Sequence, residues 1–404
     1  MAANVHAKII CFLPESVPKM STIFQIDQQT LLRNVTALSA ILLSISMLVI
    51  PAAQAQTIVG NVSAGPAPYG LAIDTSSLSK FLYVANGGAS SATIIDTKDH
   101  YSKTGTVPVG ITPFDVAVNF ATHKAYVSSF GFGGGCGFSG GGSVTAILKG
   151  PDFRFTTTTI ALGDSENALG IDLNPVTNIV YVGGCRQVPA TVGTVSSGVV
   201  TVINGTSDTI ITTIIPPSSI PQALDDVAVD PLTNTIYAIG NFVSNFYPSF
   251  IEIWVIDGST NQVTNSFTIA GACLTNGGGF ANIADNPATN TVWLDGTNPC
   301  GGSAFLWALD GTTGAMKAAI QVPTSSCAEL LGIGVDSATN IVYMADHCDH
   351  VVWVYDGSSY ALVTALNVYP ATCCPEDVTV DPTTNTIYVS EPDSGQVTVI
   401  SGAP

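Results

Sequence analysis

The densest group of potential ligands is the segment DHCDH, Asp346 to His350, which holds two imidazoles, two carboxylates and a thiol. Zinc and copper sites use such side chains. His347, Asp349 and His350 are therefore candidate metal ligands. A solvated polar loop is the alternative that we favour, because the other three histidines of the chain form no second cluster.

A second group of candidates consists of acidic residues that stand just before short apolar runs such as DVAVN and DVAVD. These runs are expected to be the innermost strands of a ring of sheets and to line its central channel, so the carboxylates would surround the mouth of that channel. Carboxylate oxygens suit Ca²⁺ or Mg²⁺, but they could equally cap backbone N–H groups or face solvent. The candidates are Asp115, Glu166, Asp225, Asp226, Glu329, Glu376 and Asp377. No other cofactor is indicated.

Eight cysteines follow residue 55, and an even number in an exported chain favours disulfides. Topology suggests the pairs Cys136–Cys185, Cys273–Cys300 and Cys327–Cys348, which leaves Cys373 and Cys374 as a vicinal pair. An alternative joins Cys348 to Cys373 or Cys374. Disulfides at these positions would pin long glycine-rich loops that are otherwise costly to order.

The elements that position these residues are predicted from a sequence repeat, seen in NPVTNIVYVGG, DPLTNTIYAIG, NPATNTVWLDG and DPTTNTIYVSE. Each copy follows a short apolar run, and an alternating run, a turn and a fourth run come after it. The aromatic of the second run recurs seven times at intervals of 43 to 56 residues, at Tyr83, Tyr126, Tyr181, Tyr237, Trp293, Tyr343 and Tyr388. Four short antiparallel strands per unit at this period predict an all-β, seven-bladed β-propeller.

The third runs end in Asp-Gly or Asn-Gly, as in DGSTNQV, DGTTGAM and NGTSDTI. We expect these glycines to take the positive φ of tight hairpins. The last unit supplies only three strands before the chain closes. The orphan run Gln56 to Gly65 is therefore predicted to pair with Gln396 to Ser401 and to complete the last blade, which leaves no open edge in the ring.

The stretches FLYVANGG (81–88), DVTVDPT and TNTIYVSEPDSGQVTVI resemble the YVTN β-propeller repeat over essentially Gln56 to Pro404. The resemblance implies the fold and leaves function open, because such proteins include archaeal surface-layer proteins, exported bacterial proteins and relatives of virginiamycin B lyase. Those lyase relatives are described as using histidine and glutamate at the channel mouth with Mg²⁺. The starts of the first strands here contain carboxylates but no histidine, so the resemblance does not extend to that activity.

Residues 1–55 are expected to be a signal-peptide region, with Met20 as a possible start. The uncharged run Val35 to Ile50 follows Arg33 and leads to Ala53-Gln54-Ala55, a pattern typical of a cleavage site. A retained membrane anchor is the alternative. We therefore expect a secreted, periplasmic or cell-surface protein that has no transmembrane domain in its mature chain, 56–404.

The charge composition excludes one class of partner. The chain has 11 Lys+Arg against 29 Asp+Glu, so it has no basic surface for phosphate backbones, and nucleic-acid binding is not expected. We expect a monomer with a protein, small-molecule or glycan ligand.

Four predicted loops on one face, 130–143, 183–197, 241–250 and 296–303, are the longest, and all eight cysteines lie in loops of that face. The segment NFVSNFYPSF adds candidate contact aromatics, because aromatic anchors dominate recognition surfaces; these are Phe242, Phe246, Tyr247 and Phe250. The leading hypothesis is an exported, non-enzymatic binding or scaffold protein. A metal-dependent lyase or hydrolase with an acidic channel mouth and a cell-surface structural array are the alternatives.

Overall fold

The computed structural model describes residues 56–77, 80–131, 141–150, 152, 154–163, 166–189, 194–215, 223–242, 250–273, 282–298, 302–325, 329–368 and 374–402. The predicted signal segment lies outside these residues. Ala55–Pro404 forms one compact unit. No helix among the described residues is long and apolar enough to cross a bilayer.

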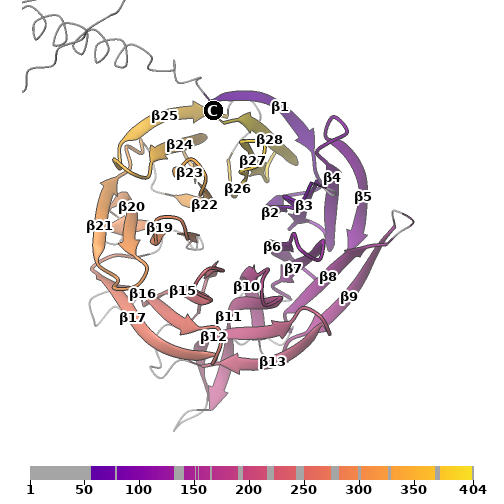
Figure 1. The fold of residues 1–404 in the computed structure, drawn as a ribbon, viewed down its shortest axis with the longest axis horizontal. Coiled ribbons are helices and arrows are strands. Elements are labelled where there is room, and N and C mark those ends of the chain that lie inside the picture. Colours follow the sequence, from indigo (N-terminus) through magenta and orange to yellow (C-terminus); the bar gives the residue numbers. More distant parts are fainter. Residues whose placement is uncertain are drawn as a thin grey trace, which may run out of the picture. The chain divides into compact units, whose positions relative to one another are not determined.

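Seven four-stranded antiparallel sheets form a closed ring, as predicted (Figure 1). Within a blade, successive strands run from the central channel outward, and we call the first of them the inner strand. Blades 1 and 2 contain β2 (Pro68–Ile73), β3 (Phe81–Asn86), β4 (Ser91–Asp96) and β5 (Ser102–Pro108), then β6 (Pro113–Asn119), β7 (Lys124–Ser129), β8 (Ser143–Lys149) and β9 (Phe155–Ala161). Blades 3 and 4 contain β10 (Glu166–Asn174), β11 (Ile179–Pro189), β12 (Thr194–Asn204) and β13 (Thr209–Ile214), then β14 (Asp226–Asp230), β15 (Thr235–Phe242), β16 (Phe250–Asp257) and β17 (Gln262–Ala270).

The remaining blades follow the same plan. Blades 5 and 6 contain β18 (Ile283–Asn286), β19 (Thr291–Asn298), β20 (Ser303–Asp310) and β21 (Met316–Gln321), then β22 (Leu330–Asp336), β23 (Ile341–Asp346), β24 (Val351–Asp356) and β25 (Leu362–Asn367). Blade 7 contains β26 (Val378–Asp381), β27 (Thr386–Glu391), β28 (Gln396–Ser401) and, as its outer strand, β1 (Thr57–Ser63).

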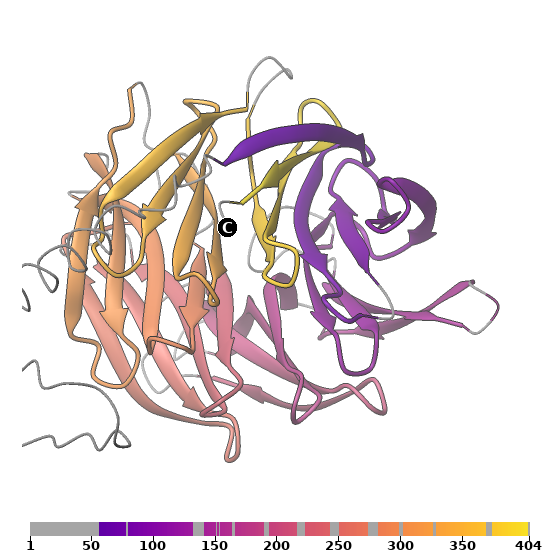
Figure 2. The ribbon, with the colours of Figure 1, turned by 45° about the horizontal axis from the view of Figure 1, so that its top comes forward.

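The ring closes through β1, which pairs antiparallel with β28 from Thr57 opposite Ser401 to Ser63 opposite Gln396. In Figure 2 the indigo β1 lies beside the yellow strands of blade 7. The prediction that the N-terminal run completes the last blade is therefore confirmed. The core lies between adjacent blades; for example, Leu71 of blade 1 packs with Tyr388 and Val397 of blade 7.

The repeated turn joins neighbouring blades at the end of each inner strand. Asn174 at the end of β10 caps the turn by accepting the backbone N–H of Val176 at 2.9 Å, and its amide Nδ2 donates to Oδ1 of Asn234 in blade 4 at 2.7 Å. Asn119 donates in the same way to Asn178 at 2.7 Å. Asn286 donates in the same way to Asn340 at 2.8 Å, so the asparagine at the start of these copies of the Asp/Asn-Pro-x-Thr-Asn repeat connects its blade to the next one.

The expected reason for glycine after the third strand is wrong. Gly205 and Gly258 are not among the residues with positive φ; Asp208 (55°) and Asn261 (55°), three residues later, adopt that conformation. Glycine is needed because the asparagine of the repeat fills the space, so that a Cβ at Gly258 would lie 2.7 Å from Oδ1 of Asn234.

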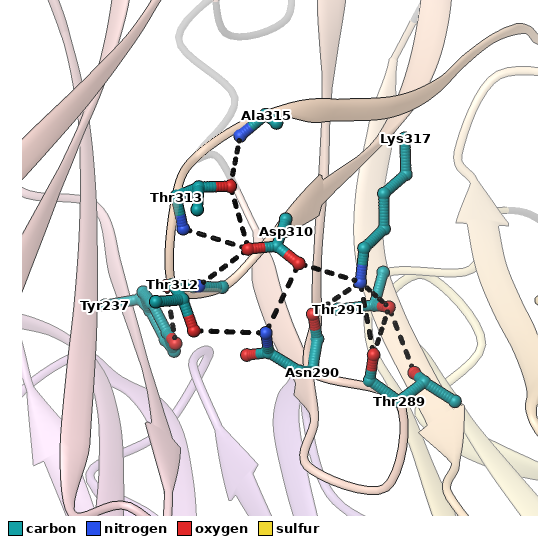
Figure 3. Close-up of polar contacts among 10 residues, drawn as sticks. Tyr237, Thr289, Asn290, Thr291, Asp310, Thr312, Thr313, Ala315 and Lys317 are labelled. Carbon is teal, nitrogen blue, oxygen red and sulfur yellow. Dashed lines mark hydrogen bonds and ion pairs between the residues drawn. The ribbon is translucent and has the colours of Figure 1, made fainter.

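Figure 3 shows the corresponding hairpin of blade 5. Oδ1 of Asp310 accepts the backbone N–H groups of Thr312 at 3.2 Å and Thr313 at 2.9 Å. The hydroxyl of Tyr237, from blade 4, donates to the carbonyl of Gly311 at 3.1 Å. The recurring aromatic of one blade is therefore hydrogen-bonded to the hairpin of the next blade.

One predicted loop is largely strand. Residues 183–197 were expected to form a loop, but β11 and β12 continue through this segment and pair up to Pro189 opposite Thr194, with residues 190–193 outside the described part. Figure 1 shows this hairpin protruding from the ring. The β-branched residues Val188, Thr194 and Val195 suit an extended ladder, whereas Gly183 and Gly184 give no local signal of a strand.

Candidate functional site

The predicted acidic residues Asp115, Asp226 and Asp377 lie at equivalent positions at the start of the inner strands of blades 2, 4 and 7. We call the face on which the inner strands begin the mouth face. Each of the three carboxylates lines both the mouth pocket and the channel below it. The structure thus brings these three aspartates together at the channel mouth, and a functional role for them there stays a prediction.

Each of these aspartates bridges two blades through backbone amides. Oδ1 of Asp226 accepts the N–H of Val227 at 2.7 Å, and its Oδ2 accepts the N–H of Ile283 in blade 5 at 3.0 Å. Asp115 repeats the arrangement with Ile171 of blade 3 at 2.9 Å, and Asp377 repeats it with Leu71 of blade 1 at 3.0 Å. Of the roles left open by the sequence, capping of backbone N–H groups is the one observed.

Glycine occupies the equivalent position in blades 1, 3 and 6, because the aspartate of the next blade lies against it. A Cβ added to Gly70 would lie 2.5 Å from Oδ1 of Asp115, and one added to Gly170 would lie 2.1 Å from Oδ1 of Asp226. At these positions, an aspartate in one blade therefore requires a glycine at the equivalent position of the preceding blade.

Burial raises the pKa of all three carboxyl groups. The pKa of Asp377 rises to about 6, and neighbouring carboxylates add to the effect of burial at Asp115 and Asp226. The hydrogen bonds from backbone amides oppose this shift because they stabilise the charged form. The channel mouth thus holds its protons at a higher pH than exposed aspartates do.

The sequence did not single out two further channel carboxylates, Asp172 and Asp285. Asp172 accepts the N–H of Leu173 at 2.7 Å and that of Val229 at 2.8 Å, and burial raises its pKa to about 7. Burial also raises the pKa of Asp285 to about 8. Both residues sit inside apolar runs, so the only available signal was a charge that interrupts the apolar alternation.

The predicted glutamates take separate positions. Glu166 is buried and accepts a hydrogen bond from the hydroxyl of Thr201 in its own blade, and burial raises its pKa. The carbonyl of Glu329 accepts the N–H of His347 at 2.9 Å. Glu376 lines the mouth pocket, and its Oε2 lies 3.3 Å from Nδ1 of His347. That contact raises the pKa of His347 despite its partial burial.

The DHCDH turn points its candidate ligands at different partners. Asp349 accepts the N–H of Ser325 at 2.5 Å, whereas Nδ1 of His350 accepts the N–H of Cys374 at 3.3 Å. His347 faces Glu376. The turn therefore bridges the connections that precede and follow blade 6, and its three candidate ligands do not converge.

No group of three or more His, Cys, Asp or Glu side chains is arranged to hold a metal ion within the residues that the structure describes. The aspartates of the mouth already accept backbone amides with both oxygens. The binding of Ca²⁺ or Mg²⁺, suggested by composition, stays a prediction that this geometry does not favour.

A pocket at the channel mouth was not foreseen. It is a cavity of about 70 Å³, and besides the three aspartates its lining includes Tyr69, Phe114, Asp225, Leu331 and Glu376. The rings of Tyr69 and Phe114, from blades 1 and 2, lie 6.3 Å apart and are tilted by 55°. These aromatics come from different repeats, and the packing of blade 1 against blade 2 brings them together. Below the pocket, the channel adds a cavity of about 360 Å³.

The candidate contact aromatics of the loop at 241–250 are only partly described. Phe250, half-buried, begins β16 and lies opposite Phe242 in the ladder. Phe246 and Tyr247 lie outside the described residues. Their role in recognition stays a prediction, as do the disulfide pairings, because Cys136, Cys300, Cys327 and Cys373 also lie outside the described part of the chain.

Comparisons with known proteins show the fold and leave the family open. No protein-family model matches the chain, and no curated protein matches it by sequence. Three similar solved structures are Kuenenia stuttgartiensis hydrazine synthase, the β-propeller domain of Myceliophteria thermophila Cps50 (Swd1) and Chaetomium thermophilum Raptor. Their TM-scores are 0.65, 0.59 and 0.61 at 17%, 9% and 12% identity. The matches cover 88%, 86% and 86% of this chain and 99%, 99% and 28% of the respective structures. This likeness supports a seven-bladed propeller, while the resemblance to YVTN repeats stays a prediction.

Proposed function

We propose that the protein is a non-enzymatic binding or scaffold propeller that recognises its ligand with the mouth face. The observation that carries this proposal is the pocket walled by Tyr69 and Phe114 over a channel lined by carboxylates. A concave site with apolar walls and a few polar groups is the usual form of a ligand site. The central channel of a propeller is a natural place for such a site.

The hydrogen bonding of the mouth favours binding over catalysis. Asp115, Asp226 and Asp377 each hold a neighbouring blade through a backbone amide, which is a structural task. His347 is paired with Glu376, which lines the pocket. Four of the five carboxylates that line the pocket are therefore engaged by protein groups, and only Asp225 is left as a potential general acid or base.

We further propose that the protein is exported and that disulfides support the mouth face. The signal-like segment of residues 35–55 supports export. The positions of Cys185, Cys273 and Cys348, which all lie on the mouth face, support these disulfides. Cys273 also exchanges backbone hydrogen bonds with Thr297, at 3.0 and 2.7 Å, close in sequence to its predicted partner Cys300. Mass spectrometry of peptides from non-reduced protein tests the pairings.

The experiment that tests mouth-face binding is a ligand screen that makes no assumption about ligand charge. The purified protein and its Phe114→Ala variant are compared by thermal shift against a library of cationic, anionic and neutral compounds and short peptides. The proposal predicts at least one ligand that stabilises the wild type and has no effect on the variant. If every stabilising ligand acts equally on both proteins, the mouth is not the binding site and the proposal fails.

A further inference from the structure

The mouth pocket combines two aromatic rings with carboxylates contributed from across the ring. Tyr69 and Phe114 come from blades 1 and 2, whereas Asp225 comes from blade 4 and Glu376 from the connection before blade 7. Both rings are half-buried, so part of each remains open to a ligand. Leu331 adds an apolar surface. The site therefore offers an aromatic wall and negative charge within one cavity.

Lys and Arg are absent from the described residues that line the pocket and the channel. The pocket has five carboxylates: Asp115, Asp225, Asp226, Glu376 and Asp377. An anion would meet repulsion from each of them that is ionised, and among the described residues only His347, paired with Glu376, offsets this repulsion when it is protonated. The charge of the site thus selects against anionic ligands.

Asp225 differs from the other four carboxylates of the pocket in its hydrogen bonding. Asp115, Asp226 and Asp377 accept backbone amides, and Glu376 faces His347. Among the described residues, none donates a hydrogen bond to the side chain of Asp225. Burial alone raises its pKa to about 7. A partly buried carboxylate without a partner is costly to ionise, and a cation that enters the pocket would remove that cost.

These features favour an organic cation over other occupants. An aromatic ring attracts an ammonium or guanidinium group through its negative face, and the attraction grows when the cation is desolvated. A neutral apolar ligand would leave Asp225 unpaired. A bare metal ion needs several oxygen ligands, and aspartates such as Asp226 already accept backbone amides with both oxygens. We propose that the mouth pocket binds an alkylammonium or alkylguanidinium group, which stacks against Tyr69 and Phe114 and pairs with Asp225. This inference rests on the proposed function and names the ligand class of the same site.

Two sources could supply this group: a lysine or arginine side chain of a peptide, or a free amine. The probes are n-butylguanidinium and n-butylammonium, with n-butanol as the neutral control, titrated calorimetrically at pH 8 so that Asp225 is ionised. Blocked arginine, N-acetylarginine N-methylamide, forms a further arm. Tighter binding of the blocked residue than of n-butylguanidinium would indicate a peptide source, and equal binding would indicate a free amine. Either result supports the proposal.

The variants are chosen with matched controls. Asp225→Asn and Phe114→Leu should each weaken binding of n-butylguanidinium at least tenfold. Asp99→Asn, at an exposed hairpin of blade 1, and Phe120→Leu, just beyond the far end of the inner strand that holds Phe114, should leave it unchanged. Equal weakening by the control substitutions, or unchanged binding in Asp225→Asn, would overturn the assignment.

Nuclear magnetic resonance of the wild-type protein tests the same ligand site without relying on the folding of any variant. Nuclear Overhauser contacts between the methylene protons of n-butylguanidinium and the ring protons of Phe114 are expected. Their absence in saturated protein, or binding of n-butanol as tight as that of the cations, overturns the proposal even if a variant fails to fold. If the cations fail while neutral or anionic library members bind the wild type and not Phe114→Ala, this inference fails and mouth-face binding stands.

Discussion

Replacing Asp226 by alanine tests the interpretation that carboxylates hold the inner strands together. The substitution removes the acceptor for the N–H of Val227 at 2.7 Å and for the N–H of Ile283, in the next blade, at 3.0 Å. A buried donor left without an acceptor costs about 1–3 kcal/mol. Because two such donors are created, and removal of a buried carboxyl returns part of the cost, we expect a loss of about 2–4 kcal/mol in the free energy of unfolding.

Asp226→Asn should lose less than the alanine variant, because its amide oxygen can still accept one of the two N–H groups. The loss in Asp226→Ala should also depend on pH. Burial and the charges of Asp115 and Asp377 raise the pKa of Asp226, so the wild-type carboxyl contributes most at low pH, and this contribution falls as pH rises through its raised pKa. The difference between wild type and Asp226→Ala should therefore be larger at pH 5 than at pH 8.

The assay is equilibrium urea unfolding followed by tryptophan fluorescence, with Asp99→Ala as the control, since the side chain of Asp99 is 75% exposed. The control should change the free energy of unfolding by less than about 0.5 kcal/mol. A free energy of unfolding in Asp226→Ala equal to that of the control would refute the interpretation that this carboxylate joins blades 4 and 5.

Three further predictions follow from the fold. Deleting residues 57–63 removes β1 and exposes the edge of β28, so size-exclusion chromatography should show association or aggregation, whereas a monomeric elution profile would argue against closure by this strand. Gly258→Ala should lower the free energy of unfolding by about 1–3 kcal/mol, because the new Cβ would collide with Asn234. In urea unfolding, the double variant Gly258→Ala/Asn234→Gly should recover part of this loss. No recovery would contradict the packing argument. The midpoint temperature of thermal unfolding should decrease as the pH is raised from 5 to 8. Burial raises the pKa of Asp172 to about 7 and that of Asp285 to about 8, and a group with a raised pKa loses its stabilising contribution as pH rises. Asp285→Asn should weaken this pH dependence, and a midpoint that increases with pH would contradict the prediction.

Most of the fold follows from the period of the sequence. Seven recurring aromatics and four alternating runs per unit predict the blades, and the orphan strand from Thr57 predicts the closure. The reason for the glycine of Asp-Gly could not be predicted, because it depends on Asn234, which lies more than twenty residues away and meets Gly258 only in the folded blade. A strand that continues through glycines, as β11 does at Gly183 and Gly184, also lacks a local signal.

The site was predictable only in part. The position of Asp226 before an apolar run placed it at the channel mouth, but the sequence could not choose between binding a cation and capping an amide of the next blade. Tyr69 and Phe114 belong to different repeats, so their approach depends on the packing of two blades. The DHCDH turn had ligand composition without ligand geometry, since His350 and Asp349 have separate partners.

A crystal structure of the protein with N-acetylarginine N-methylamide would test the central claim most directly. The account predicts that the guanidinium lies over the rings of Tyr69 and Phe114 and within hydrogen-bonding distance of the carboxylate of Asp225. A ligand bound only at the outer strands, or at the repeated turns on the opposite face, would contradict it.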